Sequence, residues 1–85
     1  MKMRMFSIFD AKAETFMPPF CCNSVGIAKR DFSDAVNDGK SYVNKHPEDY
    51  SLFEIGMYDD QTGHCDMLAT PLSHGVGISY KIEEN

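Results

Sequence analysis

The sequence predicts a single α+β domain, in which one helix packs on an antiparallel sheet. Two patterns predict this class. One segment repeats apolar residues at helical spacing, and other segments alternate their side chains in the manner of strands. The length of 85 residues leaves room for one domain only. A domain of this size buries about 60–65% of its unfolded surface, so pairing with a second copy would help it.

The composition narrows the class of protein. Hydrophobic residues make up 42% and charged residues 25%, which is typical of a folded domain. The net charge of −5 counts against a strong binder of nucleic acid, because phosphate neutralisation supplies most of the affinity of such proteins. No apolar run approaches the ~18–20 residues that span a bilayer, and no signal-peptide cleavage site is present. Three cysteines, an odd number, agree with a reducing compartment, so we expect a cytoplasmic protein.

Residues 1–10 are predicted to form a strand. Large apolar side chains alternate onto both of its faces, which suits an inner strand or a strand with a covered second face. One face carries Met3, Met5, Ser7 and Phe9, and the other carries Arg4, Phe6 and Ile8.

Residues 11–23 form a polar turn followed by an apolar arm. The prolines of the arm lack a backbone N–H, which excludes them from the centre of a sheet. The arm either covers its own sheet or docks on a second copy, and we predict docking, with a two-fold dimer favoured. A proline-stiffened segment loses less entropy on docking than a flexible one. The arm consists of Phe16, Met17, Pro18, Pro19 and Phe20.

Residues 24–38 carry the helical pattern. Ser24, or Asn23 before it, is a natural N-cap, and Gly39 is expected to end the helix in a left-handed conformation. A polar connection over residues 40–49 follows, with a tight turn at its Pro-Glu-Asp end. The apolar stripe that should face the sheet consists of Val25, Ala28, Phe32, Ala35 and Val36.

The pattern over residues 50–69 predicts a β-hairpin. A first strand runs over residues 50–58, the loop contains Gly63, and the returning strand ends at Thr70-Pro71. Residues 75–82 are interpreted as a short last edge strand.

The sequence offers no catalytic or metal motif, so we expect no enzyme activity, no cofactor and no metal. Its three histidines lie outside any local Ser/His/Asp or Cys/His signature. The alternative is a zinc site, but adjacent cysteines are a poor pair of ligands. We expect Cys65 and one of the adjacent cysteines to be buried as small hydrophobes instead. The zinc ligands of the alternative would be Cys21, Cys22, His64 and Cys65.

Cations near aromatic side chains are the candidates for binding single-stranded DNA. Stacking on an unpaired base needs only an exposed aromatic face and a nearby positive charge. From the residues alone, core aromatics and solvated lysines are the more favoured interpretation. The candidates are Arg4, Lys12, Phe16, Phe20, Lys29, Arg30, Lys40, Tyr42 and Lys45.

Segments over nearly the whole chain resemble one family. The most specific are FD-x-K-A-E before the Pro-Pro-Phe arm, and HPEDYSLFEIG before a D-D-x-T-G turn. They resemble the small nonstructural DNA-binding protein of gokushovirus-type microviruses, which are phages with single-stranded circular DNA genomes. The similar segments are Met3–Phe20, Ala28–Asp38, Lys45–Gly63 and Gly75–Lys81. The pair Cys21-Cys22 is not a feature of that family, so the resemblance assigns it no function.

The resemblance implies a non-capsid phage protein of the host bacterial cytoplasm. Its implied role lies in the passage from genome replication to the synthesis and packaging of single-stranded DNA, without catalytic residues. The charge of −5 then predicts a weak, local DNA site, or binding that also needs a protein partner. The competing hypothesis is a protein-interaction module that acts on the phage replication initiator, the procapsid or a host replication factor. We expect no membrane association.

Overall fold

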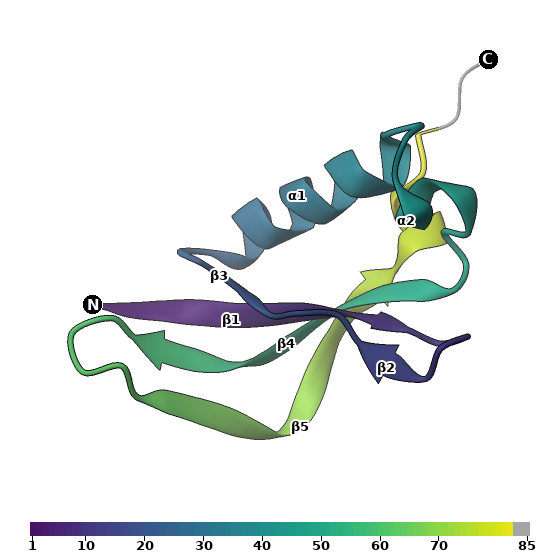
Figure 1. Ribbon diagram of the computed structural model, residues 1–85. Helices are drawn as coiled ribbons and strands as arrows, with labels where there is room; N and C mark the ends of the chain where they lie inside the picture. Colours follow the sequence, from purple (N-terminus) through teal and green to yellow (C-terminus); the bar gives the residue numbers. More distant parts are fainter. Residues whose placement is uncertain (83–85) are drawn as a thin grey trace.

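The computed structural model, which describes residues 1–82, confirms the α+β class (Figure 1). A five-stranded antiparallel sheet has the order β2-β1-β4-β5, and β3 also pairs with β1. The helix α1 lies across one face of this sheet. The elements are β1 Lys2–Asp10, β2 Thr15–Phe16, β3 Phe20–Cys22, α1 Val25–Asn37, α2 Tyr42–Lys45, β4 Tyr50–Asp59, β5 Cys65–Val76 and the 3₁₀-helix η1 Gly77–Tyr80.

The apolar arm pairs with its own sheet. Strands β2 and β3 follow each other along the same edge of β1, with Phe16 opposite Phe9 and Phe20 opposite Phe6. The two prolines lie between these short strands, at an edge where a missing N–H costs no ladder bond. The Ser7 hydroxyl donates a hydrogen bond of 2.6 Å to the carbonyl of the neighbouring methionine of the arm. Within one chain, therefore, the arm completes the sheet edge, which is the first of the two alternatives.

The predicted apolar stripe of α1 faces the sheet. Ala28, Phe32 and Val36 are buried, as the spacing predicts. Ser24 is the N-cap, since its hydroxyl oxygen accepts a hydrogen bond of 3.2 Å from the Ile27 N–H. The core between helix and sheet consists of Phe6, Ala28, Phe32, Val36, Val43 and Leu52.

The expected left-handed stop at Gly39 is wrong. The only positive-φ glycines in the described chain are Gly63 and Gly75, and α1 ends instead at Asp38 in an extended conformation. The polar connection that follows contains a helix, α2, which the sequence reading missed. Four residues are too few to show helical periodicity, although the cap is present: Ser41 accepts a hydrogen bond of 3.0 Å from the Asn44 N–H.

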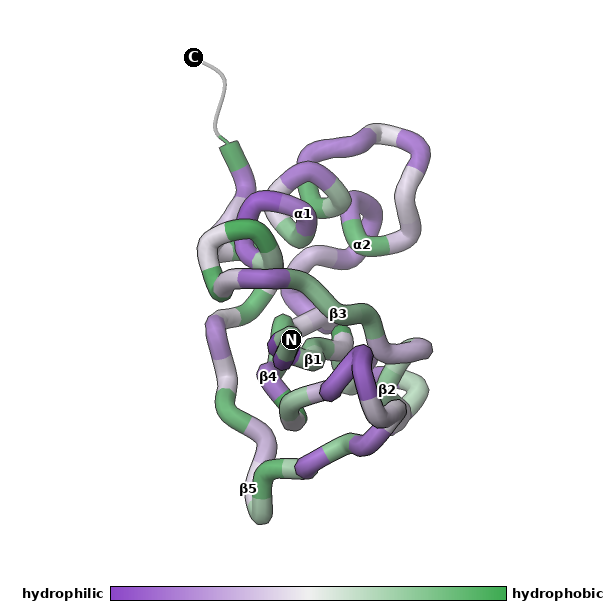
Figure 2. The backbone as a smooth tube through the Cα atoms, turned by 90° about the vertical axis from the view of Figure 1, so that its left-hand side faces the viewer, coloured by the Kyte–Doolittle hydropathy of each residue, from purple (hydrophilic) through white to green (hydrophobic). Residues whose placement is uncertain are grey.

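Strand β5 runs to Val76, well past its predicted end at residue 69. The register passes from Met67 opposite Gly56 to Leu72 opposite Glu54, so the residues between them bulge out of the ladder. Pro71 lies in this bulge, where no ladder N–H is required, and therefore does not end the strand. Figure 2 shows the consequence: α1 and α2 lie together on one side of β1 and β4, while the middle of β5 lies on the other.

The predicted edge strand over residues 75–82 is also wrong, because Gly77–Tyr80 forms the 3₁₀-helix η1 beside α1. Gly75, with a φ of 112°, makes the change of direction that L-residues rarely adopt. Gly77 approaches Pro47 so closely that a Cβ atom would lie 2.6 Å from the proline carbonyl oxygen. The longest helix of the described chain, α1, has 13 residues, and none is long and apolar enough to cross a membrane.

Candidate nucleic-acid interface

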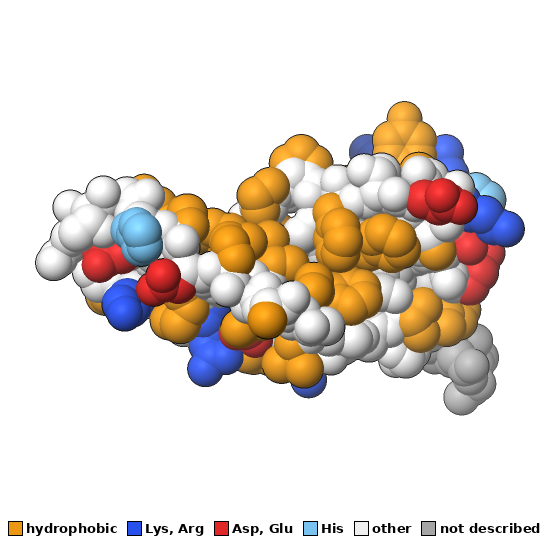
Figure 3. All heavy atoms as spheres, turned by 90° about the horizontal axis from the view of Figure 1, so that it is seen from below, with side chains coloured by type: hydrophobic (Ala, Val, Ile, Leu, Met, Phe, Trp, Pro, Cys, Tyr) orange, Lys and Arg blue, Asp and Glu red, His pale blue; other side chains and the backbone are white. Residues whose placement is uncertain are grey.

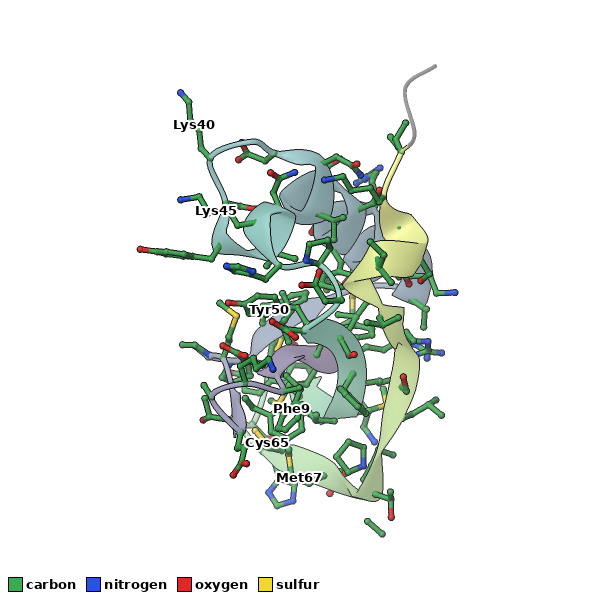
Figure 4. The ribbon with its side chains drawn as sticks, turned by 90° about the vertical axis from the view of Figure 1, so that its right-hand side faces the viewer. Phe9, Lys40, Lys45, Tyr50, Cys65 and Met67 are labelled. Carbon is green, nitrogen blue, oxygen red and sulfur yellow. The ribbon has the colours of Figure 1, made fainter. Side chains whose placement is uncertain are left out.

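An exposed aromatic ring and two lysines gather around α2 at one end of the molecule. Burial of Val43 against the core turns Tyr42 outward, with 75% of it exposed. Lys45 follows three residues later on the helix, and its Nζ atom lies 5.8 Å from the centroid of the Tyr42 ring. Lys40, in the turn before α2, extends from the same side of the molecule as Lys45 (Figure 4). We call Lys40, Tyr42 and Lys45 the α2 patch.

The turn between β1 and β2 brings a further predicted cation, Lys12, to a depression of about 520 Å³ beside α2. The Ala11 N–H donates a hydrogen bond of 2.9 Å to the Asp49 carbonyl, which holds this turn against the end of the connection. Burial, with Asp10 nearby, raises the pKa of Tyr50 in its wall. The depression therefore mixes charges of both signs. Its lining residues are Asp10, Lys12, His46, Glu48, Asp49 and Tyr50.

The other predicted DNA-binding residues lie elsewhere. The guanidinium of Arg4 forms an ion pair of 3.2 Å with Glu54, so its charge is already matched. Phe20 is half-buried, and its ring centroid lies 5.9 Å from that of Phe6, which makes it a core contact rather than a free platform. Lys29 and Arg30 are exposed on α1.

Phe16 lies on the face of the sheet away from α1. Its ring centroid is 4.8 Å from that of Phe9 and 5.7 Å from that of Phe53, yet 44% of the residue stays exposed. The predicted set therefore divides among the α2 end, the outer side of α1, the core and the sheet face.

The structure holds one group of potential metal ligands in the described residues, and it is not the cysteine set. Ligand atoms of His46, Glu48 and Asp49 lie within 4.8 Å of one another and could hold a cation. Cys22 and Cys65 lie on β3 and β5, with β1 and β4 between them, so the zinc alternative is not assembled. The expectation that Cys65 is buried is wrong, because it is exposed at the start of β5. Metal-free function stays a prediction.

A buried carboxylate, which the sequence reading missed, links the strands of the sheet. Only 10% of the Glu54 side chain is exposed, and it contacts both Arg4 and His74. These residues meet only through the register of β1, β4 and β5, which local sequence patterns do not reveal. Arg4 and His74 are both engaged with Glu54, and we assign the group to the stability of the sheet.

Comparison with known proteins identifies the family of the chain. A family model described as "Phage ORF5 protein" matches residues 3–79. The match includes the whole of the α2 patch, the apolar arm and both long strands of the hairpin. No curated protein and no solved structure matches the chain.

Proposed function

Because the chain belongs to the family of phage ORF5 proteins, we propose that it is a non-enzymatic phage accessory protein that binds single-stranded DNA through the α2 patch. The observation that carries the proposal is the pairing of Tyr42 and Lys45. Tyr42 is 75% exposed, and an ammonium group lies 5.8 Å from the centroid of its ring. An exposed aromatic face beside a cation is what stacking on an unpaired base with a neighbouring phosphate requires.

The proposal predicts weak binding of single-stranded DNA. Stacking of one base contributes about 1–3 kcal/mol, and two lysines contact few phosphates. The net charge of −5 opposes the approach of a polyanion. A duplex keeps its bases stacked inside, so the patch prefers single strands.

We propose that this activity serves the passage from genome replication to the synthesis and packaging of single-stranded DNA. The proposal rests on the resemblance to the nonstructural proteins of gokushovirus-type microviruses, together with the family of phage proteins. The place of action would be the host bacterial cytoplasm, where such genomes are copied.

Fluorescence anisotropy of a labelled oligo(dT) tests the proposal. At low salt we expect binding whose log K falls against log salt with a slope of about −1.4, since two phosphates are neutralised at about −0.7 each. Tyr42→Ala should weaken binding about tenfold or more, and Tyr42→Phe should retain it, because stacking needs the ring and not the hydroxyl. Lys45→Ala should weaken binding and make the slope shallower.

Lys2→Ala is the matched control, because Lys2 is an exposed lysine at the N-terminal end of β1, far from α2 (Figure 1). Equal losses in Lys2→Ala and Lys45→Ala would show attraction by overall charge and contradict a local site. No shift at micromolar protein in low salt would refute DNA binding. That result would favour the alternative, a protein-interaction module for a phage replication protein, the procapsid or a host replication factor.

A further inference from the structure

The sheet face turned away from α1, which we call the open face, is apolar and has no helix over it. Its centre is a cluster of Phe9, Phe16 and Phe53, whose ring centroids lie 4.8, 5.7 and 6.3 Å apart. Met67 continues the face across β5, and it is 57% exposed. Figure 3 looks at this side of the molecule and shows hydrophobic side chains in a broad band, with charged groups toward its margins.

The register explains why the open face carries no charge. Phe9 pairs with Ser51 and Ser7 with Phe53, so these residues share a face of the sheet. Beyond the bulge, Met67 of β5 lies opposite Gly56 of β4 and therefore on the same face. None of the strand residues placed there is Asp, Glu, Lys or Arg. These residues are Met3, Met5, Ser7, Phe9, Phe16, Ser51, Phe53, Gly56, Tyr58, Cys65, Met67, Ser73 and Val76.

An antiparallel sheet that exposes one face to water usually carries polar side chains there. This sheet instead carries partly exposed apolar side chains there, Phe16 and Met67 among them, beside uncharged serines, while Met5 and Ser7 on the same face are buried. An exposed apolar patch of this kind marks an interaction site. Because the face is uncharged, it offers no charge complement to a strongly acidic or basic partner.

The chain exposes more surface than a compact monomer of its mass. The chain exposes 5631 Å², whereas a monomer of its mass is expected to expose about 5,100 Å². Its radius of gyration of 13.4 Å likewise exceeds the ~12 Å expected for a compact domain of this length. The excess surface, roughly 500 Å² over the whole chain, is smaller than the ~800 Å² that each partner buries in an interface of standard size, so a dimer contact of this chain would be a small one.

We propose that the open face is the contact between two copies of this chain, related by a two-fold axis. A two-fold contact brings the same patch together from both copies, so an uncharged apolar face meets an uncharged apolar face. Two chains of net charge −5 repel each other, and this face is where they meet without burying a charge. Phe16 takes part while staying paired with its own β1, so the contact needs no exchange of arms. The dimer does not depend on the DNA site.

Sedimentation equilibrium of the full chain from about 1 to 100 μM tests the dimer, a range that covers micromolar dissociation constants. We expect the wild type to dimerise within it. Met67→Glu should raise the dissociation constant at least about tenfold, because pairing would bury a carboxylate in an apolar contact. Ile78→Glu is the matched control: Ile78 is 51% exposed on η1, beside α1, and the substitution adds the same charge.

Phe16→Glu, at the other side of the open face, provides a second variant, and circular dichroism checks that each variant keeps its helix. Loss of the dimer in Met67→Glu and Phe16→Glu with retention in Ile78→Glu supports the proposal. A wild type that stays monomeric at about 100 μM overturns it. Equal weakening in Met67→Glu and Ile78→Glu also overturns it, because the contact would then respond to net charge alone.

Discussion

The Nε2 atom of His74 lies 3.0 Å from Oε1 of Glu54, and both side chains are nearly buried, at 14% and 10% exposure. Glu54 is on β4 just before the point where β5 leaves the ladder, and His74 is on β5 just after the strand returns. The other oxygen of Glu54 accepts a hydrogen bond of 3.2 Å from Arg4 on β1. One carboxylate therefore joins three strands at the place where the sheet register changes.

Replacing this carboxylate should destabilise the sheet. We expect Glu54→Ala to lower the free energy of unfolding by about 2–3 kcal/mol, because His74 loses its partner inside the protein while half-exposed Arg4 regains water. Urea denaturation followed by circular dichroism measures this loss. Glu54→Gln keeps an acceptor and should cost about half as much. A loss below about 0.5 kcal/mol in Glu54→Ala would show that the pairing contributes nothing.

Phe32 should be the most costly helix residue to truncate. It is 1% exposed, and its ring centroid lies 5.0 Å from that of Tyr80 on η1. Phe32→Ala should lower the free energy of unfolding by about 3–5 kcal/mol, through lost burial and the cavity that remains. Lys29→Ala, on the exposed side of the same helix, should change it by less than about 0.5 kcal/mol. Similar costs for the two variants would place the buried face of α1 elsewhere.

Predictions that depend on contacts within one helix or strand are more accurate than predictions that depend on contacts between elements far apart in the sequence. The stripe of α1 and the alternation of β1 depend on neighbours within one element, and both are confirmed. The alternation of β4 holds only up to Glu54, because the register with β1 shifts there and puts Gly56 and Tyr58 on the face of Phe53. The path of β5 through Pro71 is not local, because it depends on the bulge opposite Glu54 and Gly56. Gly39 carried a sound local signal for a helix stop, but the Ser41 hydroxyl donates to the Ala35 carbonyl and satisfies the helix end instead.

The same distinction between local and long-range contacts applies to the candidate site. Tyr42 and Lys45 could have been joined from the sequence had α2 been recognised, because they lie three residues apart on a helix. Arg4 and Phe20 were assigned to DNA on residue type alone. Their contacts within the protein, Glu54 and Phe6, come from other strands, and only the sheet register brings them together. The same register makes the open face uncharged.

Gly56 should tolerate no side chain. A Cβ atom there would lie 2.6 Å from the carbonyl oxygen of Asp66, which is backbone and moves only with β5. Gly56→Ala should therefore lower the free energy of unfolding by about 1–3 kcal/mol in denaturant titration. Gly39→Ala is the control, since nothing lies within 4 Å of its Cβ position. It should leave stability unchanged or raise it by up to about 1 kcal/mol. Tolerance of both substitutions would contradict the close approach of β5 to β4.

Tyr80 should make the fold sensitive to alkali. Burial raises the pKa of its hydroxyl, which donates a hydrogen bond of 2.6 Å to the His74 carbonyl. Above the ordinary tyrosine pKa of about 10, the unfolded chain loses this proton before the folded chain does. The stabilising contribution is thus complete below pH ~10 and is lost as pH rises through the raised pKa of the folded state.

Tyr80→Phe separates this titration from the packing of the ring, because the ring remains against Phe32. At pH 7 we expect a loss of about 1 kcal/mol, since the His74 carbonyl loses its donor. Between pH 9 and 11, the free energy of unfolding should fall less steeply in the variant than in the wild type. Some decline persists, because burial raises the pKa of Tyr50 as well. Urea titrations at several pH values measure both effects. Parallel curves for the two proteins would mean that the Tyr80 proton is not linked to folding.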